Sequence, residues 1–305
     1  MAFLRQETED KRQETEDQRQ EMSAETPLLE VKDVHLSFKG VRAIDGISFQ
    51  VLPRQLFAII GPNGAGKTSI FNSINQVYRP QSGQILWKGR SILGLKPNKT
   101  AELGIARTFQ NIALFPHMTV IDNILTGRHV RMNRGWLAGS LWVGPAKREE
   151  MANRARVEDI IDFLEIEQWR KYPVGLLPYG IQKRVELGRA LAMDPELLML
   201  DEPVAGMNLE ETEDMARFVL DIQDELGIAM ILVEHDMGLV MDIADRVMVV
   251  DFGRKIAEGE PGEVQRNPDV VRAYLGEEFQ SAELQEAAAE ASEASEPVTT
   301  GADSL

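Results

Sequence analysis

Two kinds of apolar pattern follow one another along the chain. In the first, apolar and polar residues alternate, as in antiparallel strands with one face in the core. This pattern covers Leu28–Phe38 and Ile47–Leu52, and Gln84–Lys88 is a third candidate. The second pattern is a short, continuously apolar run, which suits a central strand covered on both faces. Such runs occur at Leu56–Ile60, Leu197–Leu200 and Met230–Val233.

A helical pattern fills the middle of the chain. Between about residues 111 and 189, strand-like runs are few. Together with the strands on either side, this pattern predicts an α/β fold with a mostly parallel core sheet. A small antiparallel β subdomain and an α-helical subdomain at about 111–189 would complete it. We expect residues 27–276 to form this folded unit.

The two ends of the chain differ from the rest in composition. Of the net charge of −16, residues 1–26 carry −4 and residues 277–305 carry −8, which leaves −4 for the body. The first tail repeats Arg-Gln-Glu-Thr-Glu-Asp from Arg5 and again from Arg12. Its seven-residue period lacks the apolar seam that a coiled coil needs. Tails this poor in apolar residues cannot offset their ordering entropy, so both are predicted to be disordered.

Composition narrows the classes of protein to which the chain can belong. No apolar run approaches the roughly 18 residues that span a bilayer. A charged, polar stretch follows the first four residues, unlike the apolar core of a signal peptide. The absence of cysteine excludes disulfides, cysteine-ligated zinc and thiol catalysis. We therefore expect a soluble, cytoplasmic protein.

A phosphate-binding loop directly follows the apolar run that ends at Ile60. The segment Gly-Pro-Asn-Gly-Ala-Gly-Lys-Thr-Ser matches G-x-x-x-x-G-K-[ST] between a strand and a helix. Glycines let backbone N–H groups surround phosphate oxygens, and the helix N-terminus favours the same anion. Lys67 can reach the β and γ phosphates, and the Thr68 hydroxyl can ligate Mg²⁺. The predicted nucleotide-binding residues of this loop are Gly61, Asn63, Gly64, Ala65, Gly66, Lys67, Thr68 and Ser69.

Two carboxylates follow the second continuous apolar run. Asp201 and Glu202 come directly after Leu197–Leu200. A phosphate-binding loop needs an acid at the end of a second strand, near the metal. Asp201 is placed to hold Mg²⁺, directly or through water. Glu202 is placed to polarise the attacking water, and general-base help of this kind is typically worth about 10²–10⁴ in rate.

Further motifs identify the family that the sequence resembles. Arg107-Thr-Phe-Gln110 resembles the Q-loop of ABC ATPases, and Leu177–Leu187 resembles their signature sequence and the helix after it. Val204–Asn208 is similar to the D-loop, and His235 to the switch histidine. These motifs stand in the family's order over residues 28–276. The chain is therefore identified as a P-loop NTPase of the ABC ATPase type.

The resemblance implies roles for further residues. Phe38 would stack on adenine, although a place in the strand core is the alternative. Gln110 would sense Mg²⁺ and water, and His235 would contact the γ-phosphate. The implied catalytic set is thus Lys67, Gln110, Glu202 and His235, and the implied metal ligands are Thr68, Gln110 and Asp201.

The resemblance also implies partners. Two cassettes, identical or sister subunits, would pair head to tail around two ATPs. Each ATP would meet the signature residues of the partner cassette, which here are Pro178, Tyr179, Gly180, Ile181 and Gln182. Transmembrane permease subunits would anchor the pair at the cytoplasmic face of the plasma membrane. An extracellular or periplasmic binding protein would act indirectly through them.

Two positions depart from the family pattern. The usual L-S-G-G-Q is Leu-Pro-Tyr-Gly-Ile, so Pro178 replaces the serine that contacts the γ-phosphate. Proline also lacks an N–H, although the first turn of a helix tolerates it. The usual aspartate of the D-loop is Asn208, which removes a charge and keeps hydrogen-bonding capacity. We expect a competent site that closes less firmly.

The type of transporter follows from resemblance alone. The segment Glu263–Glu277 resembles the closing helix of cassettes in branched-chain amino acid importers, and Tyr179 in the signature is similar to that branch. Cassettes that power urea uptake or lipopolysaccharide export share parts of the pattern. A basic insertion at Arg128–Arg148 contains no acid between those ends and surrounds Trp136 and Trp142. It would either meet anionic headgroups or membrane subunits, or be a solvated loop with both tryptophans packed on the helices.

Two other classes of protein remain as alternatives. A soluble ABC ATPase of DNA repair or translation would usually add a coiled coil or a second cassette, and this chain has neither. Its body also lacks a basic groove, so no nucleic-acid partner is expected. A non-catalytic nucleotide-binding scaffold would not need Lys67, Asp201, Glu202 and His235 together.

Overall fold

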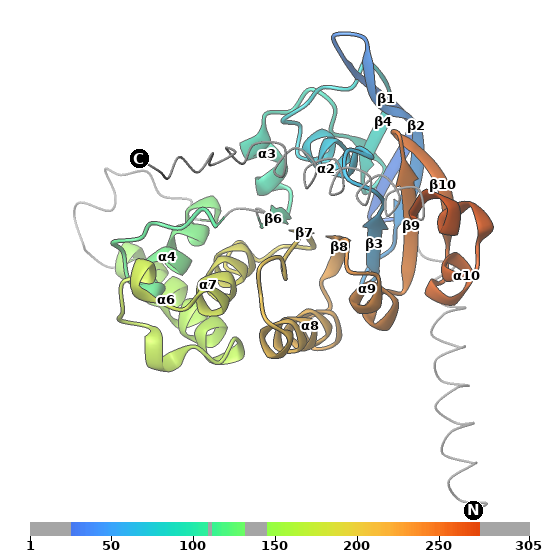
Figure 1. The fold of residues 1–305 in the computed structure, drawn as a ribbon. Coiled ribbons are helices and arrows are strands. Elements are labelled where there is room, and N and C mark those ends of the chain that lie inside the picture. Colours follow the sequence, from blue (N-terminus) through green and yellow to red (C-terminus); the bar gives the residue numbers. More distant parts are fainter. Residues whose placement is uncertain (1–25, 109–111, 132–144, 275–305) are drawn as a thin grey trace, which may run out of the picture.

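The computed structural model describes residues 26–108, 112–131 and 145–274, and these fold into two sheets and several helices (Figure 1). The predictions for both tails, for Gln110 and for the two tryptophans of the insertion fall outside these residues.

The smaller sheet is antiparallel and has the strand order β2-β1-β4-β5. Its strands are β1 (Leu29–Phe38), β2 (Val41–Val51), β4 (Ser82–Trp87) and β5 (Arg90–Ser91). Lys39 and Gly40 connect β1 to β2, and both have positive φ, at 47° and 92°. Such a two-residue turn matches the twist of a hairpin.

The larger sheet has the order β10-β9-β3-β8-β7-β6 and is parallel except at β10. Its strands are β3 (Leu56–Ile60), β6 (Ile105–Arg107), β7 (Leu197–Asp201), β8 (Ala229–Val233), β9 (Arg246–Asp251) and β10 (Arg254–Gly259). The predicted parallel core sheet with an antiparallel layer is confirmed.

The continuously apolar strands separate two cores. Along β3, Leu56, Ala58 and Ile60 join one buried cluster, whereas Phe57 and Ile59 join the other. The same alternation runs along β7 and β8. Both faces of these strands are therefore covered, which is why their sequence is apolar throughout.

Helices surround the parallel sheet, and Figure 1 shows α4, α6 and α7 gathered to one side of it. The α-helices are α2 (Lys67–Ile74), α3 (Pro97–Glu102), α4 (Val120–Gly127), α6 (Pro145–Phe163), α7 (Tyr179–Leu191), α8 (Leu209–Asp224), α9 (Met237–Ile243) and α10 (Pro261–Gln265). Short 3₁₀ turns lie at Arg128–Val130, Glu167–Trp169 and Val174–Leu176.

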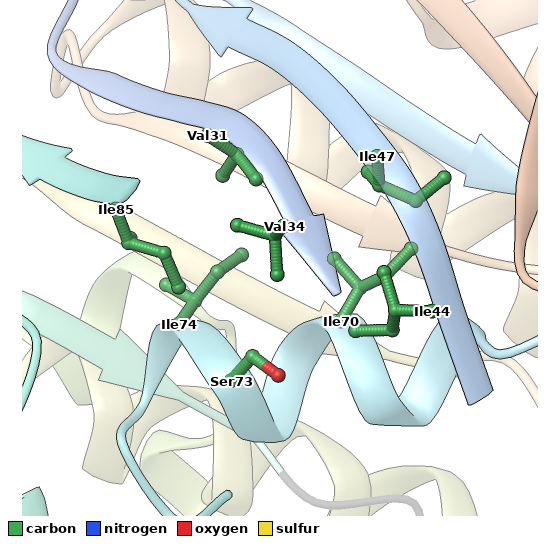
Figure 2. A pocket seen from close by; sticks show the side chains of 8 residues that line it. All are labelled: Val31, Val34, Ile44, Ile47, Ile70, Ser73, Ile74 and Ile85. Carbon is green, nitrogen blue, oxygen red and sulfur yellow. The ribbon is translucent and has the colours of Figure 1, made fainter. Parts of the chain in front are cut away.

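The antiparallel sheet holds α2 in place. Figure 2 shows Ile70 and Ile74 of this helix facing Val31, Val34 and other apolar side chains of the sheet across a cavity of about 10 Å³. Burying each such isoleucine stabilises the fold by about 1.5–3 kcal/mol. The contact fixes the helix whose first residue is Lys67.

Candidate functional site

Three loops meet at the carboxyl edge of the parallel sheet. β8 pairs with β3 on one side, where Val233 lies beside Ile59, and with β7 on the other, where it lies beside Asp201. The segments that follow these strands begin at Gly61, Glu202 and Glu234. Carboxyl edges of parallel strands are the usual place for ligand sites. The structure therefore brings the predicted glycine-rich loop, acid pair and His235 loop together.

The glycine-rich loop leads into α2. Lys67, the first residue of the helix, is 7% exposed, and its Nζ donates to the carbonyls of Gly61 and Pro62, the latter at 3.1 Å. Thr68 lies exposed beside it. The first amide N–H groups of a helix have no partner within the helix, and its dipole favours an anion. The Lys67 side chain, the first amide N–H groups and the Thr68 hydroxyl thus lie together at the N-terminal end of α2.

Backbone contacts on two sides fix the shape of the loop. A Cβ atom at Gly61 would lie 2.0 Å from the carbonyl oxygen of Val250, and one at Gly66 would lie 2.4 Å from that of Ala43. The N–H of Gly253 donates to the carbonyl of Ala65 at 2.8 Å. The loop is therefore seated between β2 and the β9–β10 turn.

An arginine connects the acid at the end of β7 to α2. Arg107 Nη2 lies 2.6 Å from Asp201 Oδ2, and its Nη1 donates to Asn72 Oδ1 at 2.6 Å. Both members of the ion pair are nearly buried. Removing one partner of a buried pair typically costs about 3–5 kcal/mol. The sequence placed Arg107 in a motif but did not reveal this contact.

Glu202 has an uncommon backbone conformation. Its φ is +49°, which L residues adopt at an energetic cost. Its N–H donates to the carbonyl of Val233 at 2.9 Å, which extends the pairing of β7 with β8 by one bond. This bond holds the half-buried Glu202 next to the loop of His235, whose side chain is 61% exposed.

A buried carboxylate that the sequence analysis missed lies between these loops. Glu234 is fully buried and accepts the backbone N–H groups of Val204 and His235. Burial raises the pKa of Glu234, and the two N–H groups partly offset that rise. Lys183 of α7 is also buried, and burial lowers its pKa while the charges of Glu186 and Glu234 raise it. A charged residue directly after a continuously apolar strand was the available signal for Glu234.

Helix α7 begins at Tyr179 and packs against the start of α8. Pro178 occupies the N-cap position, one residue before the helix, and supplies no side-chain hydrogen bond. A Cβ atom at Gly180 would lie 2.4 Å from Glu211 Oε1. The Tyr179 hydroxyl donates to the carbonyl of Ala205 at 3.2 Å. The predicted signature is therefore connected to the loop that follows the acid pair.

Asn208 closes that loop as the N-cap of α8. Its side chain accepts the N–H of Glu211 at 3.0 Å, and the Glu211 side chain accepts the N–H of Asn208 at 3.1 Å. This reciprocal pair is a capping box. The residue that replaces the usual aspartate thus retains a hydrogen-bonding role.

The comparison with family models decides the family. A model described as "ABC transporter" matches residues 44–205, over half of the chain. The chain belongs to the ABC transporter family. A second model, described as "Branched-chain amino acid ATP-binding cassette transporter", matches residues 254–280 of this cassette.

Relatives and solved structures agree with this family. The high-affinity branched-chain amino acid transport ATP-binding protein BraF of Pseudomonas aeruginosa is 38% identical over 251 residues, covering 82% of the cassette and 98% of BraF. LivG of Escherichia coli K12, of the same description, is 37% identical with the same coverage. Two solved ATP-binding cassettes, one nucleotide-free and one in an ADP conformation, are each 29% identical. Their TM-scores are 0.71 and 0.72, and each match covers 82% of this chain and 99% of theirs.

The residues of the cassette fit a nucleotide with its metal. The family implies ATP binding, and two features of the loop agree with it. No atom lies within 4 Å of a Cβ built at Gly64, and the Lys67 side chain stands at the N-terminal end of α2. Among the described residues, no group of three or more His, Cys, Asp or Glu could hold a metal alone. Mg²⁺ usually takes one or two protein ligands and completes its shell with phosphates and water. The Thr68 hydroxyl and the Asp201 carboxylate match that requirement.

Phe38 lies at the end of β1 and is 43% exposed. Its ring meets that of Tyr78 edge-on, with centroids 4.9 Å apart. The alternative that Phe38 belongs to the strand core is therefore wrong. A half-exposed ring remains accessible for stacking.

Two arginines of the basic insertion are bound within the cassette. Arg128 donates to the carbonyl of Ala192 at 2.8 Å and forms an ion pair with Asp194. Arg131 donates to the carbonyls of Met193 and Asp194 at 2.8 and 2.7 Å. These two guanidinium groups therefore bind the segment that follows the end of α7. No helix of the described residues is long and apolar enough to cross a bilayer.

Proposed function

We propose that this cassette powers the import of branched-chain amino acids by ATP hydrolysis. The match of residues 254–280 to the branched-chain family model carries this proposal. The names of BraF and LivG, which align with 98% of their own lengths, support it. The same match favours branched-chain amino acid import over the related alternatives, urea uptake and lipopolysaccharide export.

The carboxyl edge of the parallel sheet supplies the groups that hydrolysis requires. Lys67 and the first amides of α2 bind the β and γ phosphates. Glu202 accepts a proton from the attacking water, and the exposed imidazole of His235 contacts the γ-phosphate. Phe38 stacks on adenine. Pairing of β8 with β3 and β7 fixes the positions of the segments that carry Lys67, Glu202 and His235, whereas Phe38 lies at the end of β1 in the antiparallel sheet.

Mg²⁺ completes this proposal. Asp201, Thr68 and Gln110 would hold it, where it would neutralise the charge that develops on the phosphates. Arg107 keeps the carboxylate of Asp201 directed toward α2, because its guanidinium contacts both Asp201 and Asn72.

A second cassette, either another copy or a sister subunit, completes each site. In this arrangement ATP lies between the Lys67 loop of one cassette and the start of α7 of the other. Pro178 and Tyr179 are exposed, as an intermolecular contact requires, and Gly180, Ile181 and Gln182 follow them in the first turn. Hydrolysis would then depend on closure of the pair.

Pro178→Ser is expected to tighten that closure and to raise ATP turnover about twofold to fivefold. Serine at the N-cap would accept an N–H of the first turn of α7, which typically adds about 0.5–2 kcal/mol. It would also restore a hydroxyl at the end that faces the partner's nucleotide. Steady-state ATPase kinetics and dimer affinity measure the change. Unchanged values for both would remove Pro178 from the account of closure.

Membrane attachment follows from the proposed partners. Permease subunits would hold the cassette pair at the cytoplasmic face of the plasma membrane, and a binding protein outside would deliver the amino acid. This arrangement is supported by family membership and by the names of the relatives.

The substrate proposal is tested by purifying the native complex through this cassette and adding loaded binding proteins. A binding protein carrying leucine, isoleucine or valine should stimulate ATP hydrolysis. A urea-binding protein, as the control, should leave it at the basal rate. Stimulation by the urea-loaded protein alone would contradict the proposal.

A further inference from the structure

A buried carboxylate connects the two catalytic loops of the cassette. Glu234 is 0% exposed and lies directly after β8. Its Oε1 accepts the N–H of Val204, and its Oε2 accepts the N–H of His235, each at 3.2 Å. Val204 follows Glu202 by two residues. One side chain therefore spans from the loop of the proposed base to the loop of the proposed γ-phosphate contact.

We propose that Glu234 is a positioning residue for ATP hydrolysis, which holds the main chain at His235 in register with the loop that carries Glu202. This inference rests on the roles proposed above for those two residues. A carboxylate is suited to this task because each of its two oxygens accepts a hydrogen bond. In a glutamine placed in the same way, one of these two positions is an NH₂ donor, which cannot accept the N–H group that faces it.

A further hydrogen bond connects the loop that Glu234 holds to the signature helix α7. Val204, which Glu234 holds, precedes Ala205, whose carbonyl accepts the hydroxyl of Tyr179 at 3.2 Å. Within α7 the buried Lys183 is close enough for the charge of Glu234 to raise its pKa. The start of α7 therefore lies against the same loop that Glu234 holds through Val204.

Glu234→Gln is expected to lower kcat for ATP about tenfold while KM stays within twofold, because Glu234 is not proposed to touch ATP. Glu234→Leu, which removes both acceptors, should lower kcat about 100-fold, as misplaced catalytic groups do. Both kcat values are measured in the purified complex.

Asp245→Asn is the matched control, because that carboxylate accepts the N–H of Leu56 at 2.8 Å at the opposite edge of the same sheet. Its kcat should stay within twofold of the wild-type value.

A double-mutant cycle separates positioning from general loss of structure. In the His235→Ala background, Glu234→Gln should lower kcat by less than about threefold, because much of its effect passes through His235. A full tenfold loss in that background, or an unchanged kcat in the Gln single variant, would overturn the inference. If Glu234→Leu does not fold, Glu234→Gln alone tests the inference. Failure of the role proposed for Glu202 is recognised separately, because Glu202→Gln would then hydrolyse ATP like the wild type. Failure of the proposed import shows instead as ATP hydrolysis that a binding protein loaded with leucine, isoleucine or valine does not stimulate.

Discussion

Glu202→Gln is expected to reduce kcat for ATP hydrolysis by about 10²–10⁴-fold and to leave ATP affinity within a few-fold of the wild type. The change keeps the shape of the side chain but removes the oxygen base that accepts a proton from water. Glu202 is half-buried at the end of β7, and its N–H is bonded to Val233. The backbone should hold the glutamine in the same place, so binding and hydrolysis are separated.

Single-turnover hydrolysis and equilibrium binding of ATP measure the two effects. Glu210→Gln is the control, because Glu210 is an exposed acid in the first turn of α8 that no proposed step uses. It should hydrolyse ATP at the wild-type rate. Near-wild-type hydrolysis by Glu202→Gln would show that another group activates the water.

Gly61→Ala is expected to lower the free energy of unfolding by more than about 3 kcal/mol and to abolish ATP binding. The new Cβ would lie 2.0 Å from the carbonyl oxygen of Val250, which belongs to a central strand and cannot yield as a flexible side chain would. Gly61 also has φ +150°, which alanine rarely adopts. Either the loop or β9 must move.

Gly64→Ala separates the clash from the backbone conformation. Gly64 has φ +80°, but a Cβ there would meet no atom within 4 Å. We expect a loss of only about 1–2 kcal/mol, the usual cost of a left-handed L residue. Denaturant unfolding of the three proteins compares them. Equal stability of the two variants would show that the contact with Val250 does not constrain the loop.

The fold and the nucleotide loop could be predicted because their signals are local. Leu56–Ile60 and Gly61–Ser69 carry an apolar run and a motif that each act over a few residues. The burial of Glu234 could not be predicted in this way. Its partner Val204 lies 30 positions away, and Arg107 and Asp201 are 94 positions apart. Tertiary pairing at such distances leaves no periodic trace in one sequence.

Asn208 illustrates a local signal that was not used. Asn208 and Glu211 are spaced as a capping box, which the sequence alone displays. Against the family's pattern, Asn208 instead stands out as a departure from the usual aspartate. For Phe38 the local pattern was not enough. Alternation of apolar and polar residues along β1 did not reveal that the Phe38 side chain, at the end of the strand, is 43% exposed.

Uptake of labelled leucine into liposomes that contain the purified complex shows whether this cassette powers the import of branched-chain amino acids. Liposomes with the wild-type cassette, given leucine-loaded binding protein on one side and Mg²⁺ with ATP on the side of the cassette, should accumulate leucine as ATP is hydrolysed. Those with Glu202→Gln should bind ATP and accumulate none. Equal uptake by both complexes, or wild-type hydrolysis that leucine-loaded binding protein does not stimulate, would contradict the claim.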